Sequence, residues 1–166
     1  QLIVASDLVE SLSQQLELKL KPLQQVKGEA LEGLTYRHPL LERSSPVVIG
    51  GDYITTEAGT GLVHTAPGHG VDDFNTGRKY DLPVLCPVDE GGWLTEEAGP
   101  FAGLNVLNDA NPAIISALQA AKALLAEERY EHRYPYDWRT KKPTIFRATE
   151  QWFASVEGFR ESALSA

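Results

Sequence analysis

Residues 59–74, GTGLVHTAPGHGVDDF, hold the densest group of chemically capable side chains in this sequence of 166 residues. His64, His69, Asp72 and Asp73 lie within ten positions, among four glycines. Glycine lets a backbone approach a ligand closely, and a carboxylate in such a loop would pair with a cation such as a free α-amino group. The stretch therefore predicts a small binding pocket whose depth a histidine could set.

The spacing of these residues does not match two other kinds of site, a phosphate-binding loop and a nucleophilic triad. Each of the two Gly-x-Gly pairs in this stretch lacks the third glycine of the dinucleotide-binding pattern, and no Gly-Lys-Ser/Thr occurs, so a phosphate loop is excluded. The nearest serines, Ser44 and Ser45, lie outside a nucleophile elbow, and Cys86 has no histidine near it in the sequence. The sequence does not indicate a nucleophilic triad.

Two alternatives to a recognition pocket stay open. The spacings of five, three and one among His64, His69, Asp72 and Asp73 match none of the common zinc patterns, but a metal-dependent hydrolase could be built from them. A purely structural or binding module is the other alternative. In that case His64 is a satisfied core histidine, and the two aspartates complement the positive end of a helix dipole.

Composition narrows the class of protein. The chain carries a net charge of −8, which argues against broad electrostatic binding of nucleic acid but not against a narrow site for one nucleotide end. A single cysteine excludes an internal disulfide and fits a reducing compartment. No apolar run approaches the roughly 20 residues needed to span a bilayer. Because the sequence contains no methionine, we expect a piece of a longer protein.

The elements that must position the stretch are short. Apolar runs predict strands over 1–5, 18–26, 46–49, 53–56, 61–65, 84–88 and 93–94, with a hairpin-type turn at 50–52. Helices are predicted over 8–16 with Asp7 as cap, over 71–80, and from Asn111 as cap with Pro112 in the first position. These elements predict an α+β fold with a barrel-like mixed β core and a few peripheral helices. Residues 1–130 form this domain, and 131–166 form a β-ribbon that leads out of it and ends in a short helix.

Several motifs carry a resemblance to a known family. RHPL, GDYITTEAG, GTGLVHTAPGHGVDD, YPYDW and PTIFRATEQWF resemble the connective-peptide editing domain of isoleucyl-tRNA synthetases, class I enzymes, and more closely those of cyanobacterial or plastid type. The resemblance is strong from about Gly33 onward. The valine and leucine members have Ala-His-Asp where this chain has Gly68 to Gly70, and the valine enzyme has a lysine in place of His64.

The resemblance implies a specific activity and specific roles. The family's editing domain hydrolyses valine misattached to the isoleucine tRNA, and the parent enzyme uses ATP and Mg²⁺ in a separate catalytic domain. Asp73 matches the aspartate that binds the α-amino group, and His64 matches the histidine that admits valine and excludes isoleucine. No metal or protein nucleophile is implied, because a positioned water attacks the ester with help from the terminal ribose hydroxyl. The residues that would line or support the same pocket are Thr65, Gly68, His69, Gly70 and Asp72.

The resemblance also implies partners and limits. The partners are the 3′ end of the isoleucine tRNA and the rest of a synthetase, in the cytoplasm or in a plastid, with the piece itself monomeric and without membrane contact. The family's threonine-rich segment precedes this region, so we expect the 166 residues alone to fold but scarcely edit. A local positive balance predicts contacts with tRNA or with the parent's core from Arg133, Arg139, Lys141, Lys142 and Arg147.

Overall fold

The computed structural model describes residues 1–51, 54–56, 59–129 and 131–166. Within these ranges, four α-helices and one two-stranded sheet are formed, with short 3₁₀ helices between them. The α-helices are α1 (Val9–Gln15), α2 (Val71–Lys79), α3 (Ala110–Ala120) and α4 (Arg160–Leu164), and the strands are β1 (Thr35–Arg37) and β2 (Ser44–Pro46). The 3₁₀ helices are Ser6–Leu8, Gly28–Leu31, Glu96–Phe101 and Glu157–Phe159.

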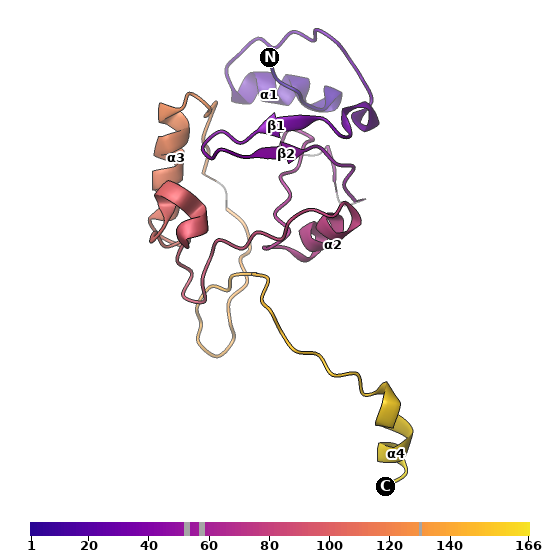
Figure 1. Ribbon diagram of the computed structural model, residues 1–166. Coiled ribbons are helices and arrows are strands. Elements are labelled where there is room, and N and C mark those ends of the chain that lie inside the picture. Colours follow the sequence, from indigo (N-terminus) through magenta and orange to yellow (C-terminus); the bar gives the residue numbers. More distant parts are fainter. Residues whose placement is uncertain (52–53, 57–58, 130) are drawn as a thin grey trace.

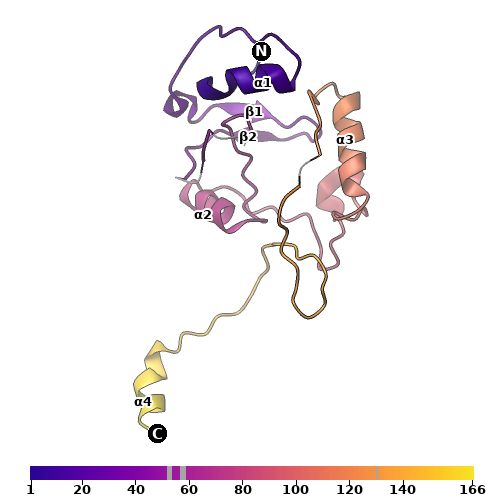
Figure 2. The same ribbon diagram turned by 180° about the vertical axis from the view of Figure 1, so that it is seen from behind.

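The sheet is an antiparallel hairpin whose ladder continues past the named strands. Tyr36 is opposite Ser45, and beyond the strands the His38 N–H donates to the Arg43 carbonyl at 2.8 Å. His38 and Arg43 are therefore the next facing pair, and they close a four-residue turn. In Figures 1 and 2 this hairpin lies between α1 and α2 along the long direction of the molecule, with α3 to one side.

The helix positions are largely confirmed, but both predicted N-caps, Asp7 and Asn111, are wrong. The helix predicted over 71–80 is α2, and the one predicted over 8–16 is α1 with the preceding 3₁₀ turn. Asp7 makes no cap hydrogen bond, because the chain enters this turn from Ala5. Asn111 was the wrong cap: α3 begins at Ala110, and the preceding residue, Asp109, accepts the Asn105 N–H at 3.0 Å, which fixes an earlier start.

Most predicted strands are extended chain rather than strand. Residues 1–5, 18–26 and 61–65 have strand-like composition but no ladder; Ala5 N–H, for example, makes one bond to the Thr60 carbonyl at 2.8 Å. A strand needs repeated pairing with a neighbour, and composition alone does not supply the neighbour. The runs at 84–88 and 93–94 contribute isolated bridges, Val88 to Leu94 and Trp93 to Asn105. The predicted turn at 50–52 and strand at 53–56 lie partly outside the described residues.

The finer description of the fold, a barrel-like core with a domain boundary, is still a prediction. Helices and a small sheet are combined in the described residues, but a barrel-like core and a domain boundary near residue 130 remain proposals. The predicted ribbon after residue 130 contains one antiparallel bridge, Tyr136 to Pro143. None of the helices in the described ranges has the length and apolar character needed to cross a membrane.

The core is small for a chain of this size. Among the described residues the buried apolar side chains are Leu8, Leu12, Val88, Ala98 and Ala110. The chain exposes 13648 Å², whereas a compact monomer of 18.2 kDa exposes about 8,100 Å². Large exposed apolar surface is typical of regions that contact other protein segments.

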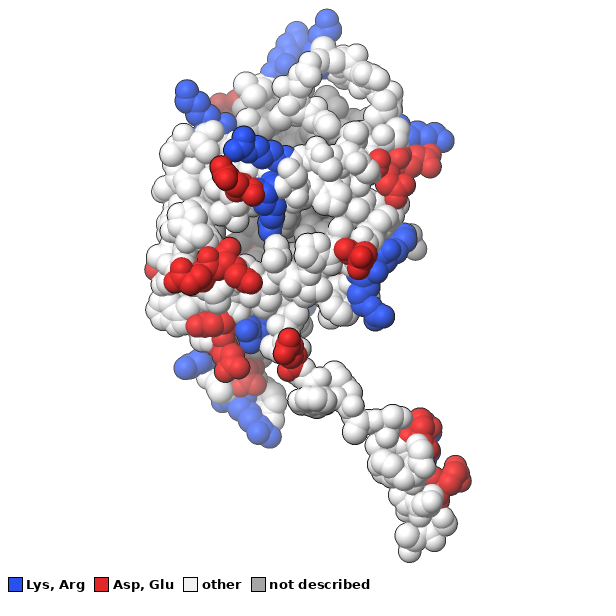
Figure 3. Space-filling model, in the orientation of Figure 1, with Lys and Arg blue, Asp and Glu red and all other residues white. Residues whose placement is uncertain are grey.

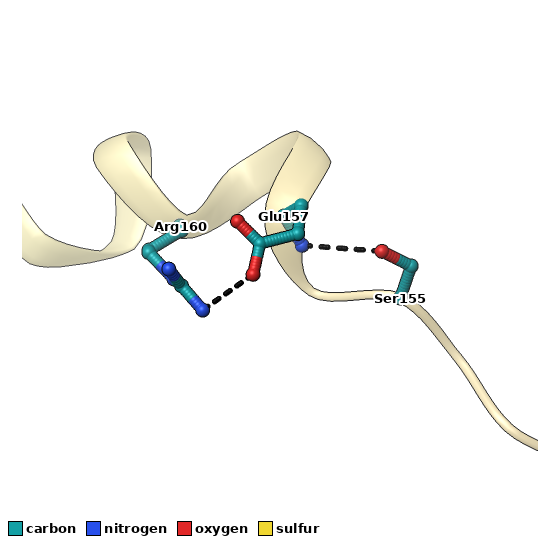
Figure 4. Close-up of polar contacts among 3 residues, drawn as sticks. All are labelled: Ser155, Glu157 and Arg160. Atoms are coloured by element: carbon teal, nitrogen blue, oxygen red, sulfur yellow. Dashed lines mark hydrogen bonds and ion pairs between the residues drawn. The ribbon is translucent and has the colours of Figure 1, made fainter.

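The C-terminal residues 149–166 extend away from the body and end in α4 (Figure 1). Trp152 and Phe153 are 103% and 90% exposed. Order in this segment is local: Ser155 Oγ accepts the Glu157 N–H at 3.4 Å, and Glu157 pairs with Arg160 at 2.5 Å (Figure 4). Exposed ion pairs of this kind contribute little stability.

Candidate functional site

The loop at 65–70 turns sharply before α2. The His69 N–H donates to the Ala66 carbonyl at 2.8 Å, and Pro67 and Gly68 occupy the turn between them. Proline fixes its own φ and stiffens such a turn. The helix then begins at Val71, so the turn delivers the first-turn carboxylates of α2 to the loop that carries the histidines.

Asp73 is bound to this loop by a hydrogen bond. Its Oδ1 accepts the Ala66 N–H at 2.9 Å, and the residue is half-buried. Gly70 makes room for the other oxygen, because a Cβ at Gly70 would lie 2.2 Å from Asp73 Oδ2. One carboxylate oxygen therefore holds the loop, and Oδ2 has no hydrogen-bond partner among the described residues.

Residues 146–148, which are distant in the sequence, form hydrogen bonds with the other side of the loop. The Ala148 N–H donates to the Gly68 carbonyl at 2.7 Å, and His69 Nδ1 lies 2.8 Å from the Phe146 carbonyl. Since a carbonyl can only accept, Nδ1 of His69 carries the hydrogen. His69 Nε2 is buried and has no hydrogen-bond partner in the part of the chain that is described. His69 therefore fastens the loop to residues 146–148.

Gly68 is required by close packing, and this gives a stability prediction. A Cβ at Gly68 would lie 2.0 Å from the Leu85 carbonyl oxygen, and the bond from Ala148 restrains the backbone from moving away. We expect Gly68→Ala to reduce the free energy of unfolding by about 3 kcal/mol or more in urea titrations. Gly28→Ala is the matched control: no atom lies within 4 Å of its added Cβ, so a change under about 1 kcal/mol is expected. Equal stability of the two variants would contradict the close approach at Gly68.

An open cavity of about 2510 Å³ lies beside the loop. Its wall includes His64, Thr65 and His69, and also His38 and Arg43 from the hairpin. Basic side chains lie beside a hollow in the face shown in Figure 3. Asp73 does not line this cavity itself, but its hydrogen-bond donor Ala66 does. The Asp73 carboxylate therefore lies behind the wall that carries His64 and is connected to this wall through its hydrogen bond with Ala66.

The remaining predicted site residues are less closely grouped. Asp72 is exposed and lines a separate shallow pocket of about 280 Å³ with Thr76 and Lys79. Gly68 and Gly70 shape the loop and do not line the large cavity. No hydrogen bond joins His64 to Asp73 among the described residues; the two flank the loop at 65–70, with Asp73 in the first turn of α2.

The basic junction candidates have different surroundings. Arg147 Nε donates to the Val88 carbonyl at 3.0 Å, which fixes this residue to the body. Arg139 stacks on Trp138, with 4.6 Å from Cζ to the ring centroid, and Arg133, Lys141 and Lys142 are exposed.

The hairpin turn that carries Lys141 is organised by a carboxylate. The pKa of Asp137 lies below its usual value because its carboxylate accepts hydrogen bonds from the Thr140 N–H and hydroxyl, and a further one from the Arg139 N–H. Desolvation has a smaller, opposing effect. The Thr140 N–H donates to Asp137 Oδ1 at 2.6 Å.

His38 is a site residue that the sequence predictions did not include. Its Nδ1 accepts the N–H groups of Leu40 and Leu41 at 3.1 and 3.0 Å, so its hydrogen is on Nε2. Burial, the nearby Arg43 guanidinium and the nearby His64 lower the pKa of His38, with burial the largest cause. Four residues separate His38 from Arg43 in the sequence, and the pairing of the hairpin strands brings both to the cavity.

The lowered pKa of His38 predicts a pH dependence of stability. The His38 imidazole binds a proton more readily in the unfolded chain than in the folded protein. The contribution of neutral His38 to the free energy of unfolding is therefore fully present above pH 6.5 and is lost as pH falls through the lowered folded-state pKa. His38→Asn keeps an acceptor near Nδ1 and removes the titration. We expect the wild type to lose more unfolding free energy than this variant between pH 7.5 and 5, measured by urea unfolding at each pH. Parallel losses would contradict the assignment to His38.

Metal ligation receives no support from side-chain grouping. No cluster of three or more His, Cys, Asp or Glu side chains suited to a metal ion occurs in residues 1–51, 54–56, 59–129 and 131–166. His64 and Asp72 belong to different pockets.

Comparison with known proteins identifies the class. A family model described as leucyl-tRNA synthetase, editing domain, matches residues 4–116. The chain belongs to this family of aminoacyl-tRNA synthetase editing domains.

Individual relatives are isoleucine–tRNA ligases of cyanobacteria. The chain is 76% identical to the ligase of Parasynechococcus marenigrum strain WH8102, 72% identical to that of Prochlorococcus marinus strain MIT 9313 and 70% identical to that of Synechocystis sp. strain PCC 6803. Each match covers 99% of this chain and 17% of the relative. The chain thus spans about a sixth of the length of these relatives, and the predicted resemblance to isoleucyl-tRNA synthetases is confirmed.

Proposed function

We propose that this chain is the editing domain of an isoleucine–tRNA ligase and that it hydrolyses valine esterified to the isoleucine tRNA. A synthetic pocket distinguishes side chains that differ by one methylene by only about 10- to 200-fold, so a second, hydrolytic selection is needed. The observation that carries the proposal is the Ala66 hydrogen bond to Asp73, which holds a carboxylate behind the cavity wall next to His64.

Asp73 binds the α-amino group of the misattached amino acid in this account. Its Oδ1 is used by Ala66, and Oδ2 is left for the ammonium. A half-buried carboxylate fixed by a backbone donor loses little conformational entropy when the ligand arrives. Gly70 contributes by leaving room for Oδ2 itself.

His64 limits the size of the amino-acid side chain. It is exposed to the cavity rather than packed in the core, so an incoming side chain meets the imidazole directly. Valine fits in front of it, and the extra methylene of isoleucine does not. Thr65 lines the same wall.

The chemical step uses water. No protein nucleophile takes part; a water positioned with the terminal ribose hydroxyl attacks the ester carbonyl, and the ester bond breaks to release valine and the tRNA hydroxyl. The domain contributes orientation, which can supply about 7 to 11 kcal/mol of a barrier. The full ligase would use ATP and Mg²⁺ to activate isoleucine in a separate domain and would act in the cytoplasm. The tRNA end would reach the cavity past the basic residues Arg133, Arg139, Lys141 and Lys142.

The direct test is deacylation by an isoleucine–tRNA ligase that carries this chain. Valyl-tRNA(Ile) and isoleucyl-tRNA(Ile) are prepared in advance, and release of each amino acid is followed with and without a zinc-specific chelator. We expect rapid release of valine, slow release of isoleucine and no effect of the chelator. Loss of activity with the chelator would favour a metal-dependent hydrolase, and no release of valine would favour a module without activity.

A further inference from the structure

The end of the β1–β2 hairpin brings two nitrogen donors to the large cavity. His38 and Arg43 face each other across the ladder, joined by the 2.8 Å bond from His38 N–H to the Arg43 carbonyl. Facing residues of an antiparallel pair project from the same side of the sheet. Both line the cavity that also contains His64, whereas Arg37, on the alternate side of the same strand, does not.

Both donors are available to a ligand. The Arg43 Nε is buried and has no hydrogen-bond partner, and Arg43 has no ion pair, within the described ranges. Because His38 Nδ1 accepts two backbone N–H groups, its hydrogen is on Nε2. A buried guanidinium nitrogen without a partner is costly unless an acceptor reaches it.

The charge around the cavity indicates what that acceptor is. Among the described residues of its wall, the acidic and basic side chains other than histidine are Asp7, Lys19, Lys21, Lys27, Glu29, Arg43 and Glu97. Lys27 is paired with Glu29 at 3.6 Å. Within the described ranges, Lys19, Lys21 and Arg43 remain as cations without an ion pair. Of these three, only Arg43 has a side-chain nitrogen that is buried and without a hydrogen-bond partner, and a planar guanidinium is well suited to bind phosphate.

We propose that Arg43 and His38 form a phosphate-binding subsite of this cavity that takes the 5′-phosphate of the terminal nucleotide of the substrate. The inference rests on the proposed function, because that function brings the esterified nucleotide to the cavity. The cavity of about 2510 Å³ is large enough for a nucleotide in addition to an amino acid. The subsite would hold the nucleotide while His64 and Asp73 select the amino acid.

The test compares two non-hydrolysable ligands, 2′-(L-valyl)amino-2′-deoxyadenosine with and without a 5′-phosphate. Binding to an isoleucine–tRNA ligase carrying this chain is measured by calorimetry, with the synthetic site saturated by an isoleucyl-adenylate analogue. We expect the phosphate to strengthen binding about tenfold in the wild type. Arg43→Gln should remove most of this gain.

Arg37→Gln is the matched control, since it removes the same charge from the same hairpin on the side away from the cavity. It should keep the full gain. If Arg43→Gln binds neither ligand, Arg43→Lys is measured, and a full wild-type gain in that variant would overturn the guanidinium assignment.

The outcomes separate this inference from the proposed function. Equal affinity of the wild type for the two ligands, or a gain that survives in Arg43→Gln or is lost equally in Arg37→Gln, overturns the subsite alone. Absence of binding by both ligands in the wild type overturns the proposed function and the subsite with it.

Discussion

Replacing Asp73 with alanine in an isoleucine–tRNA ligase that carries this chain is expected to abolish hydrolysis of valyl-tRNA(Ile) and to leave isoleucine activation near normal. Loss of a partner for a partly desolvated ammonium costs about 2 to 5 kcal/mol, which corresponds to a rate loss of roughly 30- to 4,000-fold. Deacylation of the mischarged tRNA and isoleucine-dependent pyrophosphate exchange measure the two activities separately.

The structure adds a control for this substitution. Asp73→Ala also removes the acceptor for the Ala66 N–H, so part of its effect comes from a loosened loop. Asp73→Asn keeps an amide oxygen for Ala66 and removes the charge. We expect editing to be lost in both variants, with the asparagine variant retaining stability. Editing that persists in Asp73→Asn would show that the carboxylate charge does not bind the substrate.

Truncation of His64 to alanine is expected to make correctly charged isoleucyl-tRNA(Ile) a substrate. His64 is exposed on the cavity wall, so its removal enlarges the space in front of the loop with little loss of packing. One methylene in a pocket is worth about 1 to 3 kcal/mol, and hydrolysis of isoleucyl-tRNA should rise by roughly 10- to 200-fold. Release of labelled isoleucine measures it.

A size-matched variant isolates the effect of volume. His64→Gln retains much of the side-chain length and should still exclude isoleucine. If His64→Ala hydrolyses valyl-tRNA normally and continues to spare isoleucyl-tRNA, another residue sets the size limit.

The parts of the site that are local in sequence could be predicted from the sequence. Pro67-Gly68 and the aspartates after Gly70 predict a turn followed by a helix, and α2 begins at Val71. The turn and the helix depend on backbone propensity and first-turn charge, which neighbouring residues supply. The family resemblance, confirmed by the relatives, came from the same local motifs.

The parts that depend on distant contacts could not be predicted. His69 bonds to Phe146, 77 positions away, and no pattern within the loop indicates that partner. His38 reaches the cavity because its hairpin pairs it with Arg43. Most of the predicted strands that lie in the described residues lack a ladder for the same reason, since apolar alternation does not specify which segment will pair.

The most direct test of the central claim is a crystal structure of the protein with bound 2′-(L-valyl)amino-2′-deoxyadenosine. The account predicts the valine amino group within hydrogen-bonding distance of Asp73 Oδ2 and the isopropyl group against the His64 imidazole. Valine bound away from both side chains, or an amino group held by another residue while Asp73 keeps only its bond to Ala66, would contradict it.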